Sequence, residues 1–145
     1  MNLKKSQILK MIKQWLKQWN SYNLDEVMEL MHEDIIFENW TGAIVKGKNN
    51  LQRSWVPWFT NHGYFKFITE DIFVDQKEQK VLISWTLQWP SHEKYFKGKP
   101  EIRRGVDVLH LMDGKIYRKY TYSKTTILID TTQFSLSAYK SNISN

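Results

Sequence analysis

Asp107 is the residue whose type and position point most directly to chemistry. It stands between Val106 and Val108 in an apolar run that alternates like a β-strand. An ionised carboxylate in such a strand costs several kcal/mol unless it is paired or neutralised. A carboxyl group held in an apolar cavity can give or take a proton near neutral pH. We therefore take Asp107 as the candidate catalytic residue.

Residues 101–125, which include Asp107, have the pattern of two long antiparallel strands joined by a tight turn. Asp113 and Gly114 mark that turn, because both central residues of a two-residue hairpin turn need a positive φ. A hairpin brings its second strand beside its first, so side chains of the second strand face Asp107. Those neighbours decide what the carboxylate can do.

Lys119 is the neighbour that matters most. By the period of two it shares a strand face with Tyr117 and Thr121. If that face is concave, Lys119 pairs with Asp107 and keeps it ionised, whereas a β-bulge would invert the assignment. Two roles stay open for Asp107: proton transfer or ligand binding, and a structural salt bridge to Lys119 or an arginine.

Asn39 is the second polar candidate. Its amide would hydrogen-bond a ligand, or it would close the turn before Thr41 and Gly42. The chain is also rich in aromatic residues, with 7 Trp, 7 Tyr and 7 Phe, which indicates a large apolar interior, a ligand cavity or an interface. Four of them are predicted to be core side chains that also form the walls of a cavity: Trp15, Trp55, Phe59 and Trp85.

Other residue types argue against several classes of site. The four histidines lack metal-ligand spacing on one element, so no metal site is expected. One of them, His62, follows the third predicted helix and is a candidate for a pocket mouth. There is no phosphate-binding loop, nucleophile elbow or dinucleotide fingerprint, so we expect no cofactor.

The composition indicates one globular domain. The chain has 145 residues, 41% of them hydrophobic, and a net charge of +6. Lysines near the N-terminus explain much of this charge as the solvated face of a helix, so nucleic acid ranks lowest among the partners considered. No 18-residue apolar run occurs, and we expect no membrane partner. The lack of cysteine and of a secretory signal favours a cytoplasmic protein.

Three helices are predicted in the first half of the chain. Residues 4–20 have apolar side chains at helical spacing. Asn23 caps a short second helix, with Glu26 placed to complete a capping box. The third helix covers about residues 48–62, and Pro57 predicts a kink or an early end.

Strands dominate the second half of the chain. Short strands are predicted at 35–37 and 43–46, and long ones at 65–75 and 79–89 before the 101–125 hairpin. The polar loop 90–100 is a lid over a cavity or a plain connection. We expect one α+β domain at residues 1–128 and a polar tail at 129–145. In this domain a curved, mostly antiparallel sheet forms a cone-shaped barrel with three N-terminal helices over its concave face.

Three stretches carry a resemblance to a known family. They are Trp19-Asn20 with Asn23-Leu24-Asp25, residues 33–42 with Gly47-Lys48, and residues 104–109 with residues 113–116. In order and spacing they resemble the nuclear transport factor 2-like superfamily, in particular the SnoaL-like proteins related to polyketide cyclases and ketosteroid isomerase. The resemblance covers about residues 8–126. It implies a cone-shaped α+β barrel and a homodimer formed through the outer sheet face.

The resemblance also bears on the site. By an ungapped alignment, Asn39 occupies the base position of ketosteroid isomerase and Trp15 its tyrosine position, and only the protonated aspartate position is kept, as Asp107. An amide cannot abstract a carbon-bound proton, which argues against ketosteroid-type isomerisation. Limonene epoxide hydrolase would need an arginine where Gly105 stands. SnoaL-like cyclases are similar in placing an acid/base aspartate on a late strand, and Asp107 matches it.

We therefore expect a protein that binds a small apolar ligand. If it is an enzyme, the chemistry is cofactor-independent acid/base catalysis of the cyclase or isomerase type on an apolar ring or carbonyl compound. Asp107 would transfer the proton or hold an oxyanion, and Asn39 and Lys119 would contact the ligand. The alternative is a non-catalytic protein-interaction or ligand-carrier module of the same fold.

Overall fold

Three helices, α1 (Lys5–Asn20), α2 (Leu24–Glu29) and α3 (Lys48–Asn61), precede the long strands. The structure is a computed structural model, and it describes residues 2–61 and 63–136. The apolar stripe of α1 is buried as its spacing predicted, with Ile8, Ile12, Trp15 and Trp19 in the core. Asn23 caps α2 through its side-chain oxygen, which accepts the backbone N–H of Glu26 at 3.2 Å.

α3 differs from expectation at Pro57. The helix continues through this residue to Asn61, so the predicted early end is wrong. A proline removes one backbone hydrogen bond from a helix. Apolar packing offsets that loss, because Leu51 and Trp55 are buried and Trp58 packs against the core beyond the proline.

The strands form one mixed sheet in the order β2-β1-β6-β5-β4-β3. β1 and β6 pair in parallel, and the other neighbours in this path are antiparallel. Asp113 and Gly114 turn the chain between β5 and β6 with φ values of +52° and +72°, which confirms the predicted hairpin. The strand bounds are β1 Met31–Glu38, β2 Ile44–Lys46, β3 Lys66–Asp75, β4 Lys80–Pro90, β5 Pro100–Met112, β6 Lys115–Ser123, β7 Thr126–Ile129 and β8 Thr132–Ser135.

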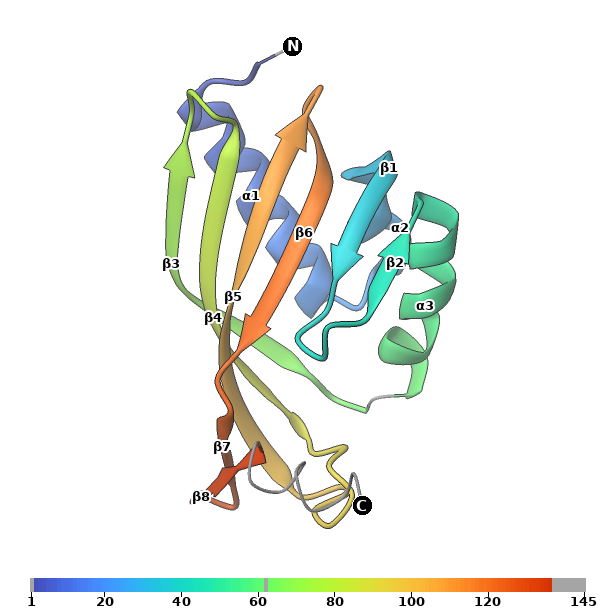
Figure 1. Cartoon of the computed structure of the whole chain (residues 1–145), viewed down its shortest axis with the longest axis vertical. Coiled ribbons are helices and arrows are strands. Elements are labelled where there is room, and N and C mark those ends of the chain that lie inside the picture. Colours follow the sequence, from blue (N-terminus) through green and yellow to red (C-terminus); the bar gives the residue numbers. More distant parts are fainter. Residues whose placement is uncertain (1, 62, 137–145) are drawn as a thin grey trace.

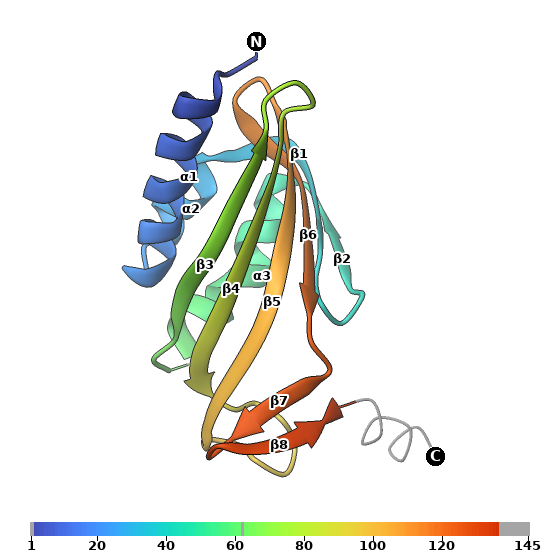
Figure 2. The same cartoon turned by 90° about the vertical axis from the view of Figure 1, so that its left-hand side faces the viewer.

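The sheet curls strongly, and the helices lie on its concave side (Figures 1 and 2). α1 runs along the face of the long strands and α3 lies beside β2, so the helices and sheet together form the expected α+β cone. Strand alternation in β4 defines the inner face, where Val81, Ile83 and Leu87 are buried. No described helix has the length and apolarity needed to cross a membrane.

The predicted tail folds further than its sequence indicates. β7 and β8 form a hairpin beside the N-terminal end of β5 (Figure 2). In the pairing of β5 with β7, Glu101 lies opposite Ile129 and Ile102 opposite Leu128. The predicted domain end at residue 128 therefore falls inside β7. Burial of Ile127 and Ile129 holds the hairpin in place, and strands of four residues are too short for a clear pattern. The rest of the predicted tail, residues 137–145, lies outside the described residues.

Candidate functional site

A cavity of about 350 Å³ lies between the helices and the concave face of the sheet. Its volume falls within the range of about 300–1,000 Å³ that is usual for small-molecule sites. All seven tryptophans of the chain line it, although they come from four separate regions of sequence. These tryptophans are Trp15, Trp19, Trp40, Trp55, Trp58, Trp85 and Trp89.

The local structure explains why these rings converge. Trp15 and Trp19 are one helical turn apart on α1 and their rings meet edge to face, with centroids 5.9 Å apart. Trp85 and Trp89 share the inner face of β4 because they are four positions apart, an even number. Trp55 completes the wall from α3, with its ring centroid 4.8 Å from that of Trp19. The result is an enclosure with rigid aromatic walls.

Asp107, Lys119 and Thr121 form a hydrogen-bonded set in the wall of this cavity. Lys119 Nζ donates to Asp107 Oδ1 at 3.2 Å and contacts Thr121 Oγ1 at 2.7 Å. The Thr121 hydroxyl donates to the same carboxylate oxygen at 2.6 Å. All three residues are buried, so solvent screens the ion pair only weakly. The two roles that the sequence left open for Asp107 thus meet in one arrangement: it is salt-bridged and it faces the cavity.

A β-bulge sets this register. Asp107 lies directly opposite Thr121, and the pairing of β5 with β6 shifts between His110 and Leu111. As a result Lys119 points inward, whereas the ring of Tyr117 lies 6.1 Å from that of His110, on the other side of the sheet. The expected shared face of Lys119 and Thr121 is therefore observed. Tyr117 does not belong to this face, because the bulge breaks the inward–outward alternation of side chains on β6 between Tyr117 and Lys119.

Lys119 sits in an aromatic box. Its Nζ is 4.8 Å from the ring centroid of Phe37, 5.7 Å from that of Trp55 and 5.9 Å from that of Trp19. The π faces stabilise the ammonium form. Burial nevertheless lowers the pKa of Lys119 below its ordinary value of 10.5, and the adjacent Asp107 only partly opposes this.

A second charged cluster, which sequence reasoning missed, lies on the same strand. Arg103 lines the cavity and pairs with two carboxylates: its Nε donates to Glu101 Oε2 and its Nη2 to Glu93 Oε2, both at 3.1 Å. Glu101 is 1% exposed. The signal was present, because residues an even number of positions from Asp107 on β5 share its face. Counting back from Asp107 would have found both Arg103 and Glu101.

Glu101 also fixes the loop between β4 and β5. Its carboxylate accepts the indole N–H of Trp89, and it accepts the hydroxyl of Ser91 at 2.9 Å. The Arg103 guanidinium lies 4.7 Å from the ring centroid of Trp40. The start of the predicted 90–100 loop is thus tied to the sheet by charged hydrogen bonds, and His92 and Glu93 of this loop line the cavity.

Trp85 separates the two clusters. It is paired with Gly105, which lies between Arg103 and Asp107 on β5, and its indole covers the glycine backbone. An added Cβ at Gly105 would lie 2.5 Å from Trp85 Cη2. The buried Trp85 indole N–H has no hydrogen-bond partner within residues 2–61 and 63–136. The glycine is therefore the position that lets this aromatic ring reach the cavity wall.

The remaining candidates are placed as follows. Asn39 lines the cavity, and it also closes the turn: its backbone N–H donates to Ala43 O at 2.9 Å, and its Oδ1 accepts from the Trp40 N–H at 2.8 Å.

Of the predicted aromatic wall residues, Trp15, Trp55 and Trp85 line the cavity. Phe59 packs against Trp19 with ring centroids 5.1 Å apart and is not among the described residues that line the cavity. His62 lies outside the described residues.

The arrangement supports proton transfer on a carbonyl compound. Lys119 supplies a donor for a developing oxyanion, and Asp107 supplies an acceptor within the same hydrogen-bonded set. Within the described ranges no group of three His, Asp or Glu side chains is placed to hold a metal ion.

Comparison with known structures places the fold. An NTF2-like protein of unknown function from Mesorhizobium loti matches 86% of this chain and 96% of its own, with 20% identity and a TM-score of 0.67. A putative ketosteroid isomerase from Kribbella flavida matches 79% of this chain and 75% of its own, with 17% identity and a TM-score of 0.62. At such identities the likeness shows the fold alone.

A third structure is an epoxide hydrolase/cyclase-like enzyme described for pyran ring formation in the polyether salinomycin. It matches 82% of this chain and 92% of its own, with 13% identity and a TM-score of 0.70. None of the curated proteins matches the chain by sequence. The model of the SnoaL-like domain family matches residues 12–119, which is most of the chain. The chain therefore belongs to the SnoaL-like domain family and has the nuclear transport factor 2-like fold.

Proposed function

We propose that this protein binds a small, largely apolar carbonyl compound in the cavity and catalyses cofactor-independent proton transfer on it. The observation that carries the proposal is the buried set of Asp107, Lys119 and Thr121 in the wall of an aromatic cavity. A charged pair desolvated beside a ligand-sized space is typical of a catalytic site, because burial strengthens its interaction with charge that develops on a substrate.

Each member of the set has a role in the proposal. Asp107, which is ion-paired with Lys119, takes the proton from a carbon next to the carbonyl group. Lys119 donates to the carbonyl oxygen and stabilises the enolate, while the Thr121 hydroxyl orients the carboxylate.

The cavity walls define the ligand. Trp15, Trp55 and Trp85 offer flat apolar surfaces, which favours a compound with one or two rings over a flexible chain. Asn39 Oδ1 is used by the Trp40 N–H, so the amide nitrogen is the group with which Asn39 would bind the ligand. Two of the structures with the same fold are described as a putative ketosteroid isomerase and an epoxide hydrolase/cyclase-like enzyme, which is compatible with a cavity for a ring compound.

The test is exchange of the α-protons of 2-tetralone, a bicyclic ketone, for deuterium in D₂O, followed by NMR. We expect Asp107→Asn to slow exchange by about 100-fold or more, which is the usual contribution of a general base. Glu70→Gln, which changes an exposed carboxylate on the outer face, is the matched control and should exchange like the native protein. Equal rates in the native protein and Asp107→Asn would refute the catalytic role.

A ligand carrier is the second candidate, and the double pairing of Asp107 Oδ1 favours it. Both Lys119 and Thr121 donate to the carboxylate, which is also how a structural ion pair would look. Calorimetric titration with 2-naphthol, a planar enol analogue, distinguishes the two. Binding of 2-naphthol together with absence of enzyme-dependent exchange would favour the carrier.

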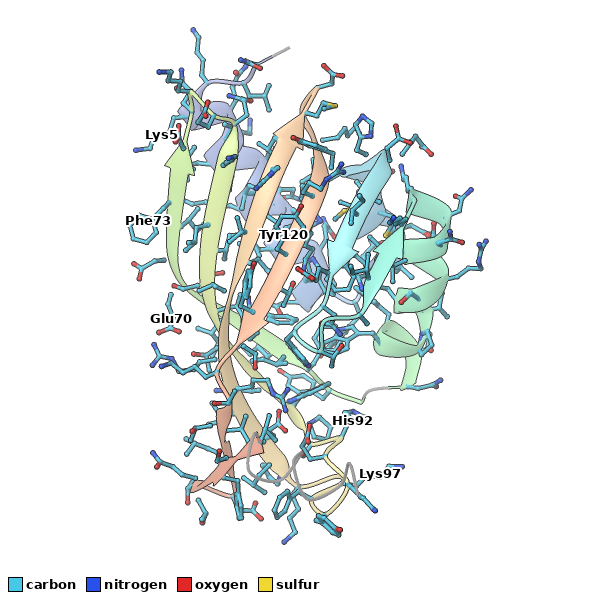
Figure 3. All side chains as sticks on the ribbon, in the orientation of Figure 1. Lys5, Glu70, Phe73, His92, Lys97 and Tyr120 are labelled. Carbon is cyan, nitrogen blue, oxygen red and sulfur yellow. The ribbon has the colours of Figure 1, made fainter. Side chains whose placement is uncertain are left out.

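We further propose a homodimer formed through the outer sheet face. Phe73 on β3 and Tyr122 on β6 are 63% and 52% exposed. Tyr120, two residues before Tyr122 on β6, is labelled with Phe73 in Figure 3. Aromatic side chains exposed on one face of a sheet are enriched at interfaces between subunits.

A further inference from the structure

Lys119 differs in its surroundings from the exposed lysines that the structure describes, such as Lys115. It is 5% exposed, and its amine lies in the cavity wall and not in water. Its neighbours are a carboxylate at 3.2 Å, a hydroxyl at 2.7 Å and three aromatic rings. Lys115, four residues earlier on β6, is exposed and donates to the backbone oxygen of Glu29. One strand thus carries a buried and an exposed amine.

The surroundings of Lys119 suit a nucleophilic amine. An ammonium ion cannot attack a carbon atom, so the proton must leave first, and burial favours this because it disfavours the charged form. Burial does lower the pKa of Lys119, so the neutral amine forms more readily there than on the surface. Asp107 lies within reach to take the departing proton.

We propose that Lys119 forms an imine with an aldehyde or ketone ligand in the cavity, with Asp107 and Thr121 carrying the protons. This deepens the proposed function and rests on the same cavity. It changes how the ligand is held, because a covalent bond to Nζ would replace the hydrogen bond from Nζ to the carbonyl oxygen. The ligand class is correspondingly narrower: an aryl or otherwise conjugated aldehyde or ketone that stacks between the tryptophans.

The steps balance without any further reactant. Asp107 accepts a proton from the Lys119 ammonium group, and the Nζ lone pair forms a bond to the carbonyl carbon while the C=O pair moves to oxygen. The proton passes from nitrogen to oxygen through the Thr121 hydroxyl, which gives a neutral carbinolamine. Asp107 then returns its proton to the carbinolamine hydroxyl, water leaves, and a protonated imine remains. The net reaction converts an ammonium ion and a carbonyl compound into an iminium ion and water.

The iminium product is compatible with the charged groups of the cavity wall. The iminium nitrogen keeps the positive charge of Lys119 beside Asp107, so the ion pair survives the reaction. The iminium ion also makes the neighbouring C–H bond more acidic, which would help Asp107 in the proton transfer proposed above.

The test is reductive trapping of the folded full-length chain with 2-naphthaldehyde and cyanoborohydride near neutral pH. Peptide mass mapping then locates the secondary amine. We expect Lys119 to be labelled at least about tenfold faster than Lys115, and excess 2-naphthol to suppress only the Lys119 label. Lys119→Arg should lose this label, while Lys115→Arg, its control on the same strand, should keep it. Asp107→Asn should slow labelling, because the proton carrier is lost.

Labelling of Lys119 no faster than Lys115 in the native protein would overturn the inference. This measurement needs no variant, so failure of Lys119→Arg to fold would not weaken it. If 2-naphthol binds and 2-tetralone exchanges but Lys119 is not labelled, the imine is wrong and the proposed acid/base function stands. If 2-naphthol does not bind and neither reaction occurs, both proposals fail.

Discussion

The indole of Trp85 on β4 lies across the backbone of Gly105 on β5, its direct partner in the sheet. This contact divides the inner row of β5 into two charged regions, with Arg103 on one side and Asp107 on the other. The aromatic ring therefore lies between the Arg103–Glu101 pair and the Asp107–Lys119 pair.

Gly105→Ala should destabilise the protein and disturb the cavity. The new Cβ would meet the Tyr122 backbone oxygen at 2.2 Å and Trp85 Cη2 at 2.5 Å, so strand or ring must shift. We expect the free energy of unfolding to fall by about 1–3 kcal/mol or more, as for overpacked cores, measured by urea denaturation. Gly98→Ala is a comparison for backbone strain without steric contact: a Cβ there meets nothing within 4 Å, and its φ of +84° should cost about 1–2 kcal/mol. A larger loss for Gly98→Ala would contradict the steric explanation.

Removing one member of the buried pair should cost more than removing both. Asp107→Leu leaves the Lys119 ammonium without its carboxylate in an apolar wall, and we expect a loss of about 3–5 kcal/mol. The double variant Asp107→Leu with Lys119→Met removes both charges and should be more stable than Asp107→Leu alone. Urea denaturation of the four proteins gives the coupling energy. Strict additivity of the two single changes would show that the pair is not coupled.

The pKa of Lys119 predicts a specific pH dependence of stability. Because burial lowers this pKa, the folded protein releases the proton at a lower pH than the unfolded chain, whose lysine has the ordinary value of 10.5. Between the two pKa values the unfolded chain binds more protons, so the free energy of unfolding rises with pH. Below the folded pKa the penalty is fully present and constant.

The measurement compares the native protein with Lys119→Met by urea denaturation from neutral pH to about 10.5, the ordinary pKa of a lysine side chain. Contributions from exposed lysines are common to both proteins and cancel in the difference. We expect the native protein to gain stability relative to Lys119→Met as the pH rises. A loss of native stability relative to Lys119→Met with rising pH would mean that the pKa of Lys119 is raised.

Glu101→Gln should destabilise the end of the cone that carries the β4–β5 loop. The change removes the charge that faces Arg103 and replaces one of the two carboxylate oxygens, which accept from Trp89 and Ser91, with an NH2 donor. We expect a loss of about 3–5 kcal/mol, because the buried guanidinium keeps only one carboxylate partner, Glu93. Glu70→Gln breaks the exposed pair with Arg104 and is the control, with little expected change. Equal effects would show that burial of the cluster does not matter.

Tyr122→Glu tests the proposed dimer. The residue is half exposed on the outer face of β6, away from the cavity, so a charge there should leave the fold and ligand binding intact. We expect analytical ultracentrifugation to show a dimer for the native protein and a monomer for Tyr122→Glu, because burying an unpaired carboxylate at an interface is costly. A native protein that sediments as a monomer would rule out the dimer.

Local physics made much of the fold predictable from sequence. The period of two in β4 identified its buried face, the Asp113-Gly114 turn needs positive φ at both residues, and Asn23 caps α2 because its side chain reaches the orphan N–H of Glu26. Each of these signals acts within a few residues. The early end expected at Pro57 is wrong because packing between α3 and the core, which no local pattern records, outweighs the missing hydrogen bond.

The candidate site, like the fold, was predictable from sequence only where local signals determine it. The sequence alone determined that Asp107 sits in an apolar strand beside a hairpin partner, and that tryptophans are numerous enough to line a cavity. Only the tertiary structure decided that Lys119 faces Asp107. The bulge between His110 and Leu111 decides which side chains of β6 point to the inner face of the sheet. The tertiary structure also gathered Arg103, Glu101 and all seven tryptophans around one space. Sheet curvature and helix packing bring these residues together, and both depend on contacts between distant parts of the chain.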